Sequence, residues 1–362
     1  MTDYVQHPRI AVLIPAYNEE VVLKGTVDAL VAAGANVQDI FVVDDRSTDL
    51  TVQVAHECGV NIFTVPVNGG KANAQKAALA EFKLLDLYEW IIFLDGDTKV
   101  EPDFIKVMRE AAIKDPSVAL YVGQVKSVKN NHVFSASRAV EYAYGQDLAK
   151  HAQSNFNVIF VSPGCSSMYR TDTLAKLHID HLTLAEDMDL TVQLHRLRER
   201  AVYLPKAIVY TQDPSTLKDY NKQILRWYRG FWQVVLKHKV MHFTKKQPVD
   251  LYMLLLIVDA TIFNRVIWLI TLMCLFPQRA WQIMASDFLI MFGVSAYGAF
   301  RTRRWDAIWK YPACYLIGFL NIAAYARALV EIVMLRKELL AWNKVARYDF
   351  DSDKADTTST KK

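Results

Sequence analysis

Residues Trp90–Asp97, WIIFLDGD, determine the fold: five apolar residues run directly into a turn that carries two carboxylates. A continuous apolar run this short predicts a strand covered on both faces, as in a parallel sheet. Similar runs occur upstream at 10–16 (IAVLIPA), 40–45 (IFVVDD) and 60–65 (VNIFTV). Helical patterns separate these runs, so the sequence predicts βαβ units and an α/β domain with a mostly parallel sheet.

Acidic residues follow two of the predicted strands. Asp44 and Asp45 end the second strand, and Asp95 and Asp97 follow the fourth. Ligands bind at the carboxyl ends of parallel strands, so these carboxylates gather at the ligand-binding edge. Two acids around a glycine can hold a divalent cation against a diphosphate, although a solvated turn has the same pattern. For the acids that follow the second strand, in the segment 44–49, helix capping is the alternative role, and it is the favoured role for Asp49.

Two further segments carry groups suited to an anionic ligand. The loop 68–71 (NGGK) precedes a predicted helix at 71–86, whose first N–H groups and Lys71 could meet an anion; a plain loop is the alternative. Glu186 and Asp187 open another helical stretch. Acids there serve as a catalytic base or merely complement the helix dipole.

A later helical stretch contains Gln223, Arg226 and Trp227, which are spaced i, i+3 and i+4 and therefore share one face. A guanidinium suits a leaving diphosphate, and an indole suits stacking on a sugar ring. An amphipathic helix lying on a membrane is the alternative, and the two interpretations are compatible.

Three long apolar stretches, 249–276, 281–300 and 311–335, dominate the C-terminal region. Each is long enough to span a bilayer, which takes roughly 20 residues. Charged residues interrupt all three, and a buried helical core of a soluble protein is the alternative. Tryptophans and a basic cluster flank the stretches and favour membrane segments, in which the internal charges would pair or line a cavity.

The expected topology leaves one point open. With a cytosolic N-terminal domain, the basic loop 301–310 returns to the cytosol, in agreement with the positive-inside rule. Three spans would then place the basic segment after residue 335 outside, against that rule. One stretch could therefore be interfacial or re-entrant, which leaves two or three transmembrane helices in the region 249–335.

Composition excludes several classes of protein. Of 362 residues, 52% are hydrophobic and 22% charged, which excludes a mainly disordered chain. The net charge of only +4 gives no electrostatic support for binding nucleic acid. Four widely spaced cysteines argue against a disulfide framework or a structural zinc site and fit a reducing compartment. The first residues lack the apolar core of a signal peptide.

Taken in order and spacing, seven motifs resemble those of family-2 glycosyltransferases, and most of all the membrane-embedded cellulose, chitin, hyaluronan and poly-N-acetylglucosamine synthases. The motifs are PAYNEE (15–20), VVDDRSTD (42–49), NGGKANA (68–74), FLDGD (93–97), SPGCSSMYR (162–170), AEDMDL (185–190) and QILRW (223–227). The resemblance implies a GT-A nucleotide-diphosphosugar transferase domain at 8–240 that ends in an interfacial QxxRW helix, then the membrane region and a polar tail at 336–362.

The same resemblance implies roles for the candidate residues. Nucleotide contacts fall to Tyr17, Glu19, Asp45 and Lys71, with Asp44 beside them and Asp95 near the ribose and diphosphate. Asp97 would bind Mg²⁺ or Mn²⁺. Asp187 matches the general base, with Glu186 beside it. Gln223, Arg226 and Trp227 match the motif that closes over the diphosphate and lines the acceptor site.

The implied function is inverting transfer of a sugar from a UDP-sugar to a growing β-linked polysaccharide at the plasma or inner membrane, with the catalytic domain in the cytosol. The alternatives are a single transfer to a lipid or lipid-linked acceptor, and a catalytically silent subunit that binds nucleotide sugar. The resemblance also leaves room for an accessory membrane subunit.

Three departures from the family pattern bear on these expectations. Ala185 stands where a threonine is usual, and Arg46 replaces a small residue in the VDDGSTD pattern. Processive synthases usually carry spans before the catalytic domain, and this sequence has no such stretch. That last difference favours the single-transfer alternative somewhat.

Overall fold

The computed structural model describes residues 8–242 and 247–340. These residues form two compact units. The first comprises residues 8–126 and 153–212, and the second comprises 127–152 and 213–340, without 243–246. Of the predicted polar tail at 336–362, residues 336–340 are described and the remainder lies outside the described part.

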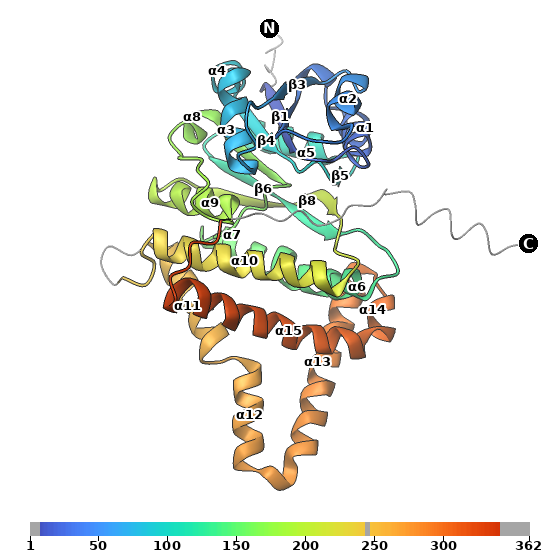
Figure 1. Cartoon of the computed structure of the whole chain (residues 1–362), viewed down its shortest axis with the longest axis vertical. Coiled ribbons are helices and arrows are strands. Elements are labelled where there is room, and N and C mark those ends of the chain that lie inside the picture. Colours follow the sequence, from blue (N-terminus) through green and yellow to red (C-terminus); the bar gives the residue numbers. More distant parts are fainter. Residues whose placement is uncertain (1–7, 243–246, 341–362) are drawn as a thin grey trace, which may run out of the picture. The chain divides into compact units, whose positions relative to one another are not determined.

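An eight-stranded mixed sheet with the order β3-β2-β1-β4-β7-β6-β8-β5 forms the centre of the first unit (Figure 1). Its strands are β1 (Ile10–Ala16), β2 (Ile40–Asp44), β3 (Asn61–Thr64), β4 (Trp90–Phe93), β5 (Thr98–Val100), β6 (Leu120–Ser127), β7 (Ser167–Arg170) and β8 (Ala201–Thr211). Its helices are α1 (Leu23–Ala32), α2 (Thr51–Glu57), α3 (Lys71–Glu81), α4 (Leu84–Leu87), α5 (Phe104–Lys114), α8 (Thr171–Leu174) and α9 (Glu186–Arg196).

Strand pairing confirms the prediction of a mostly parallel sheet. β1 pairs in parallel with β2 and β4, and β2 pairs in parallel with β3, whereas β7 is antiparallel to β4 and β6. Ala16 lies opposite Asp44 in the register. The loops after these parallel strands, which carry the predicted acids, therefore leave the sheet at the same edge.

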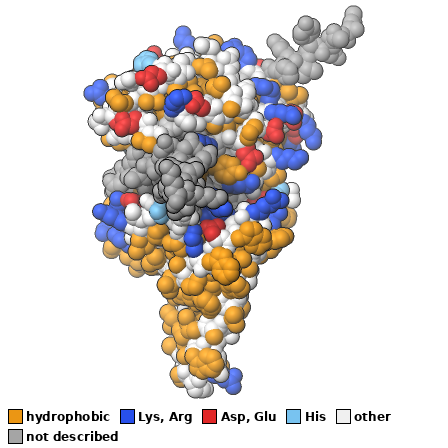
Figure 2. Space-filling model, turned by 90° about the vertical axis from the view of Figure 1, so that its right-hand side faces the viewer, with side chains coloured by type: hydrophobic (Ala, Val, Ile, Leu, Met, Phe, Trp, Pro, Cys, Tyr) orange, Lys and Arg blue, Asp and Glu red, His pale blue; other side chains and the backbone are white. Residues whose placement is uncertain are grey.

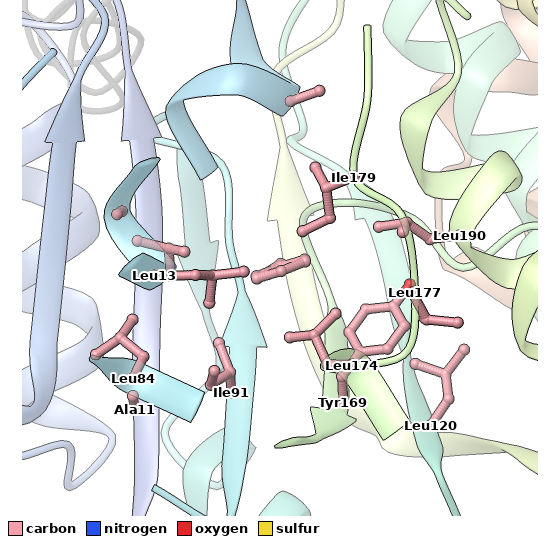
Figure 3. Close-up of a cluster of buried hydrophobic side chains, with 14 of the residues drawn as sticks. Ala11, Leu13, Leu84, Ile91, Leu120, Tyr169, Leu174, Leu177, Ile179 and Leu190 are labelled. Atoms are coloured by element: carbon pink, nitrogen blue, oxygen red, sulfur yellow. The ribbon is translucent and has the colours of Figure 1, made fainter. Parts of the chain in front are cut away.

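A continuous apolar core joins the sheet to the helices α3, α4 and α9 (Figure 3). Leu13 of β1, Ile91 of β4 and Leu190 of α9 belong to it and are at most 2% exposed. Val12, on the opposite face of β1, is buried as well. The sheet is thus covered on both faces, as the apolar runs predict. The predicted helix at 71–86 is interrupted at Lys83, whose left-handed backbone (φ 51°) separates α3 from α4.

Helices dominate the second unit. They are α6 (Val133–Tyr142), α7 (Ala149–Asn155, which continues into the first unit), α10 (Leu217–Lys237), α11 (Pro248–Thr261), α12 (Arg265–Leu275), α13 (Ala280–Thr302), α14 (Asp306–Trp309) and α15 (Tyr311–Leu329). α10 and α15 lie side by side (Figure 1). Tyr220 donates to Asn321 of α15 at 2.8 Å, and further along α10 Arg229 donates to Glu331, two residues past the end of α15, at 2.6 Å. The two helices therefore run in the same direction.

Three segments of the second unit are long and apolar enough to cross a membrane: Pro248–Leu275, Pro277–Thr302 and Tyr311–Met334. They coincide with the three predicted apolar stretches. Hydrophobic side chains cover the surface of α12 and α13 (Figure 2), where Leu275 and Trp281 are more than half exposed. Two opposite charges within the segments are paired, as expected for groups in an apolar medium: Arg265 Nε lies 3.0 Å from Asp287 Oδ1.

Candidate active site

Lys71 stands at the centre of the acidic residues in the first unit. Its ammonium lies 2.6 Å from Asp95 Oδ1, after β4, and 3.0 Å from Glu186 Oε1, at the start of α9. Burial alone would lower the pKa of Lys71, but the carboxylates of Asp95, Glu186 and Asp187 raise it well above its ordinary value. The lysine is therefore a permanent cation. We call Lys71, Asp95, Glu186 and Asp187 the Lys71 cluster.

The loop that delivers Lys71 is held by Asp45. Gly69 and Gly70 donate their N–H groups to the two carboxylate oxygens of Asp45 at 2.9 and 2.8 Å, and Asn68 donates to its carbonyl. Burial raises the pKa of Asp45, while these two N–H groups oppose the rise. The predicted anion site at this loop is thus occupied by an anion of the protein itself. Asp45 positions Lys71 through the loop.

The segment between β2 and α2 is held by hydrogen bonds within the segment and by a hydrogen bond to Asn18, in the loop after β1. Ser47 donates its N–H to Asp44, and Asn18 accepts from the N–H of Thr48 at 2.7 Å. Asp49 accepts from the N–H of Thr51, the first residue of α2, at 3.0 Å, but the N-cap position itself is Leu50, which makes no side-chain capping bond. Arg46 takes a left-handed conformation (φ 65°), the one that the usual small glycine adopts without strain.

Asp187 is oriented by two backbone groups. Met188 donates to Oδ1 at 2.8 Å and Gly164 donates to Oδ2 at 3.3 Å. A Cβ at Gly164 would lie 2.5 Å from the Lys71 ammonium, so a larger residue there would displace the end of that flexible side chain. From sequence alone, the SPGC motif assigned no role to Gly164. The glycine in the motif was the available signal, but its neighbour Lys71 is 93 positions away.

The turn carrying Asp95 and Asp97 is fixed from α1, since Thr26 donates to the carbonyl of Gly96 at 2.8 Å. Asp97 is 4% exposed. Burial raises the pKa of the Cys165 thiol, and the carboxylates of Asp95, Asp97 and Asp187 raise it further against the opposing effect of Lys71. Asp95, Asp97 and Asp187 therefore all lie close enough to the buried Cys165 thiol to act on it electrostatically.

The two acids of the DGD turn are suited to a divalent cation. Asp95 and Asp97 supply hard oxygen ligands, which suit Mg²⁺ or Mn²⁺. Within 8–242 and 247–340 no group of three His, Cys, Asp or Glu side chains is placed to hold a metal. The acids fit a cation that takes its remaining ligands from a bound diphosphate, and Asp97 would hold it.

The other predicted residues are placed as follows. Tyr17 directly follows β1 and is half-buried, and Glu19 is 7% exposed, packed beside Gly96. Gln223, Arg226 and Trp227 lie on one face of α10 in the second unit, and all three are half-buried. Within the first unit the structure thus brings Lys71 into direct contact with Asp95 and Glu186, and Asp187 is close enough to raise the pKa of Lys71.

Sequence reasoning missed a buried arginine beside the QxxRW motif. Arg138 of α6 donates to Gln223 Oε1 at 3.3 Å, and its guanidinium carbon lies 4.6 Å from the centre of the Trp227 ring. Nothing in the local pattern of α6 distinguishes Arg138 from a surface arginine, so no sequence signal pointed to it.

The greater part of the chain resembles known proteins. Residues 7–230 match the family described as "Glycosyltransferase like family 2". The poly-beta-1,6-N-acetyl-D-glucosamine synthase of Staphylococcus epidermidis is 24% identical over 259 residues, which cover 70% of this chain and 62% of the relative. The probable glycosyltransferase YdaM of Bacillus subtilis is 29% identical over 252 residues, 66% of this chain and 59% of the relative. The chain thus spans less than two thirds of either relative.

Among solved structures, the mannosyltransferase PcManGT from Pyrobaculum calidifontis, in complex with GDP-Man and Mn²⁺, aligns with a TM-score of 0.61 at 16% identity. The alignment covers 92% of this chain and 89% of that one, and it shows a shared fold. The first unit accordingly has the expected GT-A fold. With more than half of its length matched to the family, the chain belongs to glycosyltransferase family 2.

Proposed function

We propose that the protein is a metal-dependent, inverting glycosyltransferase that moves a sugar from a UDP-sugar to a growing β-linked polysaccharide at the membrane. The observation that carries this proposal is the Lys71 cluster, in which the predicted nucleotide-site lysine contacts one acid of the DGD turn and Glu186, the neighbour of the predicted base. Among relatives, the poly-beta-1,6-N-acetyl-D-glucosamine synthase supports a polysaccharide product.

Asp187 is the general base in this proposal. Two backbone N–H groups orient its carboxylate, so it can accept the proton of an acceptor hydroxyl. The hydroxyl oxygen attacks the anomeric carbon from the face opposite the diphosphate and forms the new C–O bond. The bond from that carbon to the phosphate oxygen breaks, and UDP leaves with the electron pair. Inversion of an α-linked donor gives a β-linkage.

Charge balance supports the dependence on a metal. Asp95, Asp97, Glu186 and Asp187 are four carboxylates around one ammonium, that of Lys71, which leaves a formal charge of −3 before any donor binds. An anionic diphosphate would be repelled by this site without a counter-ion. A divalent cation held by Asp97 would neutralise the diphosphate and stabilise the charge of the leaving group.

The QxxRW face would act on the leaving group and the acceptor. Arg226 suits the departing diphosphate, and Trp227 suits the acceptor sugar. Arg226→Ala should lower kcat roughly 10- to 100-fold, the value of a charged hydrogen bond, and Arg226→Lys should recover part of that loss. Trp227→Ala should instead raise the acceptor KM while UDP still binds. An unchanged kcat in Arg226→Ala, with the protein lost from membranes, would favour a purely interfacial helix.

We further propose that 248–275 and 277–302 cross the membrane and that α15 lies at its surface, with the first unit on the cytosolic side. α15 is tied along its length to α10, whose lysines and arginines are too costly to place in hydrocarbon. The arginines and lysines at 301–310 then share one side with α10, in agreement with the positive-inside rule.

Cysteine labelling tests this topology. In a variant without the four native cysteines, a membrane-impermeant maleimide should label Gln278→Cys in intact cells. Lys337→Cys should react only after the membrane is permeabilised. Labelling of Lys337→Cys from outside would instead establish three spans.

The activity is tested with the full chain in lipid nanodiscs, Mn²⁺ and a panel of radiolabelled nucleotide sugars. The expected result is release of UDP together with a long product. A product of one added sugar on lipid would establish the single-transfer alternative. Transfer from a GDP-sugar only would overturn the choice of donor, and donor binding without any transfer would establish a silent subunit.

A further inference from the structure

Arg138 is a buried cation enclosed by polar and aromatic groups of the second unit. Its side chain is 2% exposed. It donates to Glu141 at 2.6 Å, and its Nε lies 3.7 Å from Asp213 Oδ1. Burial alone would lower the pKa of Arg138, but the two carboxylates together with neighbouring tyrosines raise it. The guanidinium is therefore charged at every working pH.

Two members of the QxxRW motif depend on this one side chain. Gln223 accepts from Arg138 through its amide oxygen, and Trp227 presents a ring face to the same guanidinium at 4.6 Å. Gln223 and Trp227 are four residues apart on α10, so one planar group on α6 fixes both. The Gln223 oxygen is engaged, which leaves its two N–H donors for a substrate oxygen.

The remaining contacts hold the guanidinium itself in place. Glu141 also accepts from Asn321 of α15 at 2.9 Å, and Asp213 accepts from the hydroxyl of Ser127. Arg304 is a second buried arginine of this unit, but it binds Ser135 and Asp306 and neither residue of the motif. Arg138 thus differs from Arg304 in its partners, not in its burial.

We propose that Arg138 is a positioning residue for sugar transfer, which fixes the amide of Gln223 and the indole of Trp227 for the acceptor. This role rests on the proposed function. Arg138 has no contact with a reacting atom in this account. Its effect on transfer passes entirely through the two side chains of α10.

The test is a double-mutant cycle on the full chain in nanodiscs, with Arg138→Lys, Trp227→Ala and the combined variant. Lysine keeps the charge but loses the planar fork and the stacking surface, so Arg138→Lys should lower the acceptor kcat/KM roughly tenfold. The affinity for UDP should not change. In the Trp227→Ala background the same change should cost clearly less, because one of the two partners of Arg138 on α10 is already gone and only Gln223 remains.

Arg304→Lys is the matched control, since it alters a buried arginine without contact to the motif. It should change the thermal midpoint but show no coupling to Trp227→Ala. Equal fold losses for Arg138→Lys in both backgrounds would overturn the positioning role and leave a structural one. Wild-type protein that transfers no sugar would overturn the proposed function and this role with it.

Discussion

The Lys71 cluster and the surroundings of Arg138 are built from similar groups, a cation among carboxylates, but they differ in access. The side chains of Lys71 and Asp95 are 30% and 35% exposed, whereas those of Arg138 and Asp213 are 2% and 3% exposed. An ion pair open to solvent can exchange its partner for a ligand, whereas one this deeply buried cannot without a large desolvation cost. The first arrangement suits binding and the second suits positioning.

The largest effect on turnover should come from Asp187, the proposed base in the Lys71 cluster. Asp187→Asn keeps the shape and can retain one of the two hydrogen bonds from backbone N–H groups, but it removes the proton acceptor. Turnover should fall roughly 10²- to 10⁴-fold while UDP-sugar binding persists, measured by kinetics and by calorimetric titration. Asp28→Asn, an exposed carboxylate of α1, is the control. Loss of donor binding together with turnover would make Asp187 a nucleotide-site residue.

Metal removal should produce the next largest effect. A cation is worth several kcal/mol of charge stabilisation, so Asp97→Ala should lower turnover roughly 10²- to 10³-fold and abolish its dependence on Mn²⁺. EDTA should silence the wild type, and added Mn²⁺ or Mg²⁺ should restore it. Full turnover of the wild type in EDTA would contradict the metal requirement.

A smaller effect should follow from displacing Lys71. In Gly164→Ala the new methyl group would meet the ammonium 2.5 Å away, so Lys71 must move from Asp95 or Glu186. Turnover should fall roughly tenfold, because small displacements in a site weaken positioning. Gly145→Ala, where a Cβ meets nothing within 4 Å, is the control. Equal activity of the two variants would show that Lys71 tolerates the shift.

The smallest effect is expected for Asp213, beside the buried Arg138, and it concerns the dependence of folding stability on pH. Burial raises the pKa of Asp213 from 3.8 to about 7, despite the opposing effect of Arg138. The folded state therefore holds a proton that the unfolded chain releases between these values, and stability falls as pH rises through this window. Asp213→Asn cannot ionise. Its thermal midpoint should gain on the wild type by a few degrees between pH 5 and pH 8.

Several neighbouring groups set the pKa of Asp213. Arg138, Glu141 and Arg304 all contribute to its pKa, and Ser127 donates to it. Arg304→Lys serves as the control that preserves charge. A difference between Asp213→Asn and wild type that stays constant with pH would show that Asp213 does not titrate in this range.

Much of the first unit follows from local sequence. The apolar runs at 10–16, 40–45, 60–65 and 90–94 predicted four strands and their parallel order, because a strand buried on both faces has little alternative to continuous apolar composition. Motif order was sufficient for the GT-A fold, and the long apolar stretches were sufficient for the three apolar segments. Lys83 shows the limit. The helix at 71–86 breaks there through a left-handed residue that no composition signal marks.

By itself the sequence determined which chemical groups the protein has and on which strand ends and helix faces they lie, because backbone period and side-chain type are local properties. Tertiary structure alone decided their partners. Asp45 accepts from the loop that carries Lys71, and the Lys71 ammonium lies beside Gly164. Arg138 contacts Gln223 and Trp227. These pairs are 24 to 93 positions apart. Contacts over such separations follow from how elements pack, and no periodicity along the chain encodes them.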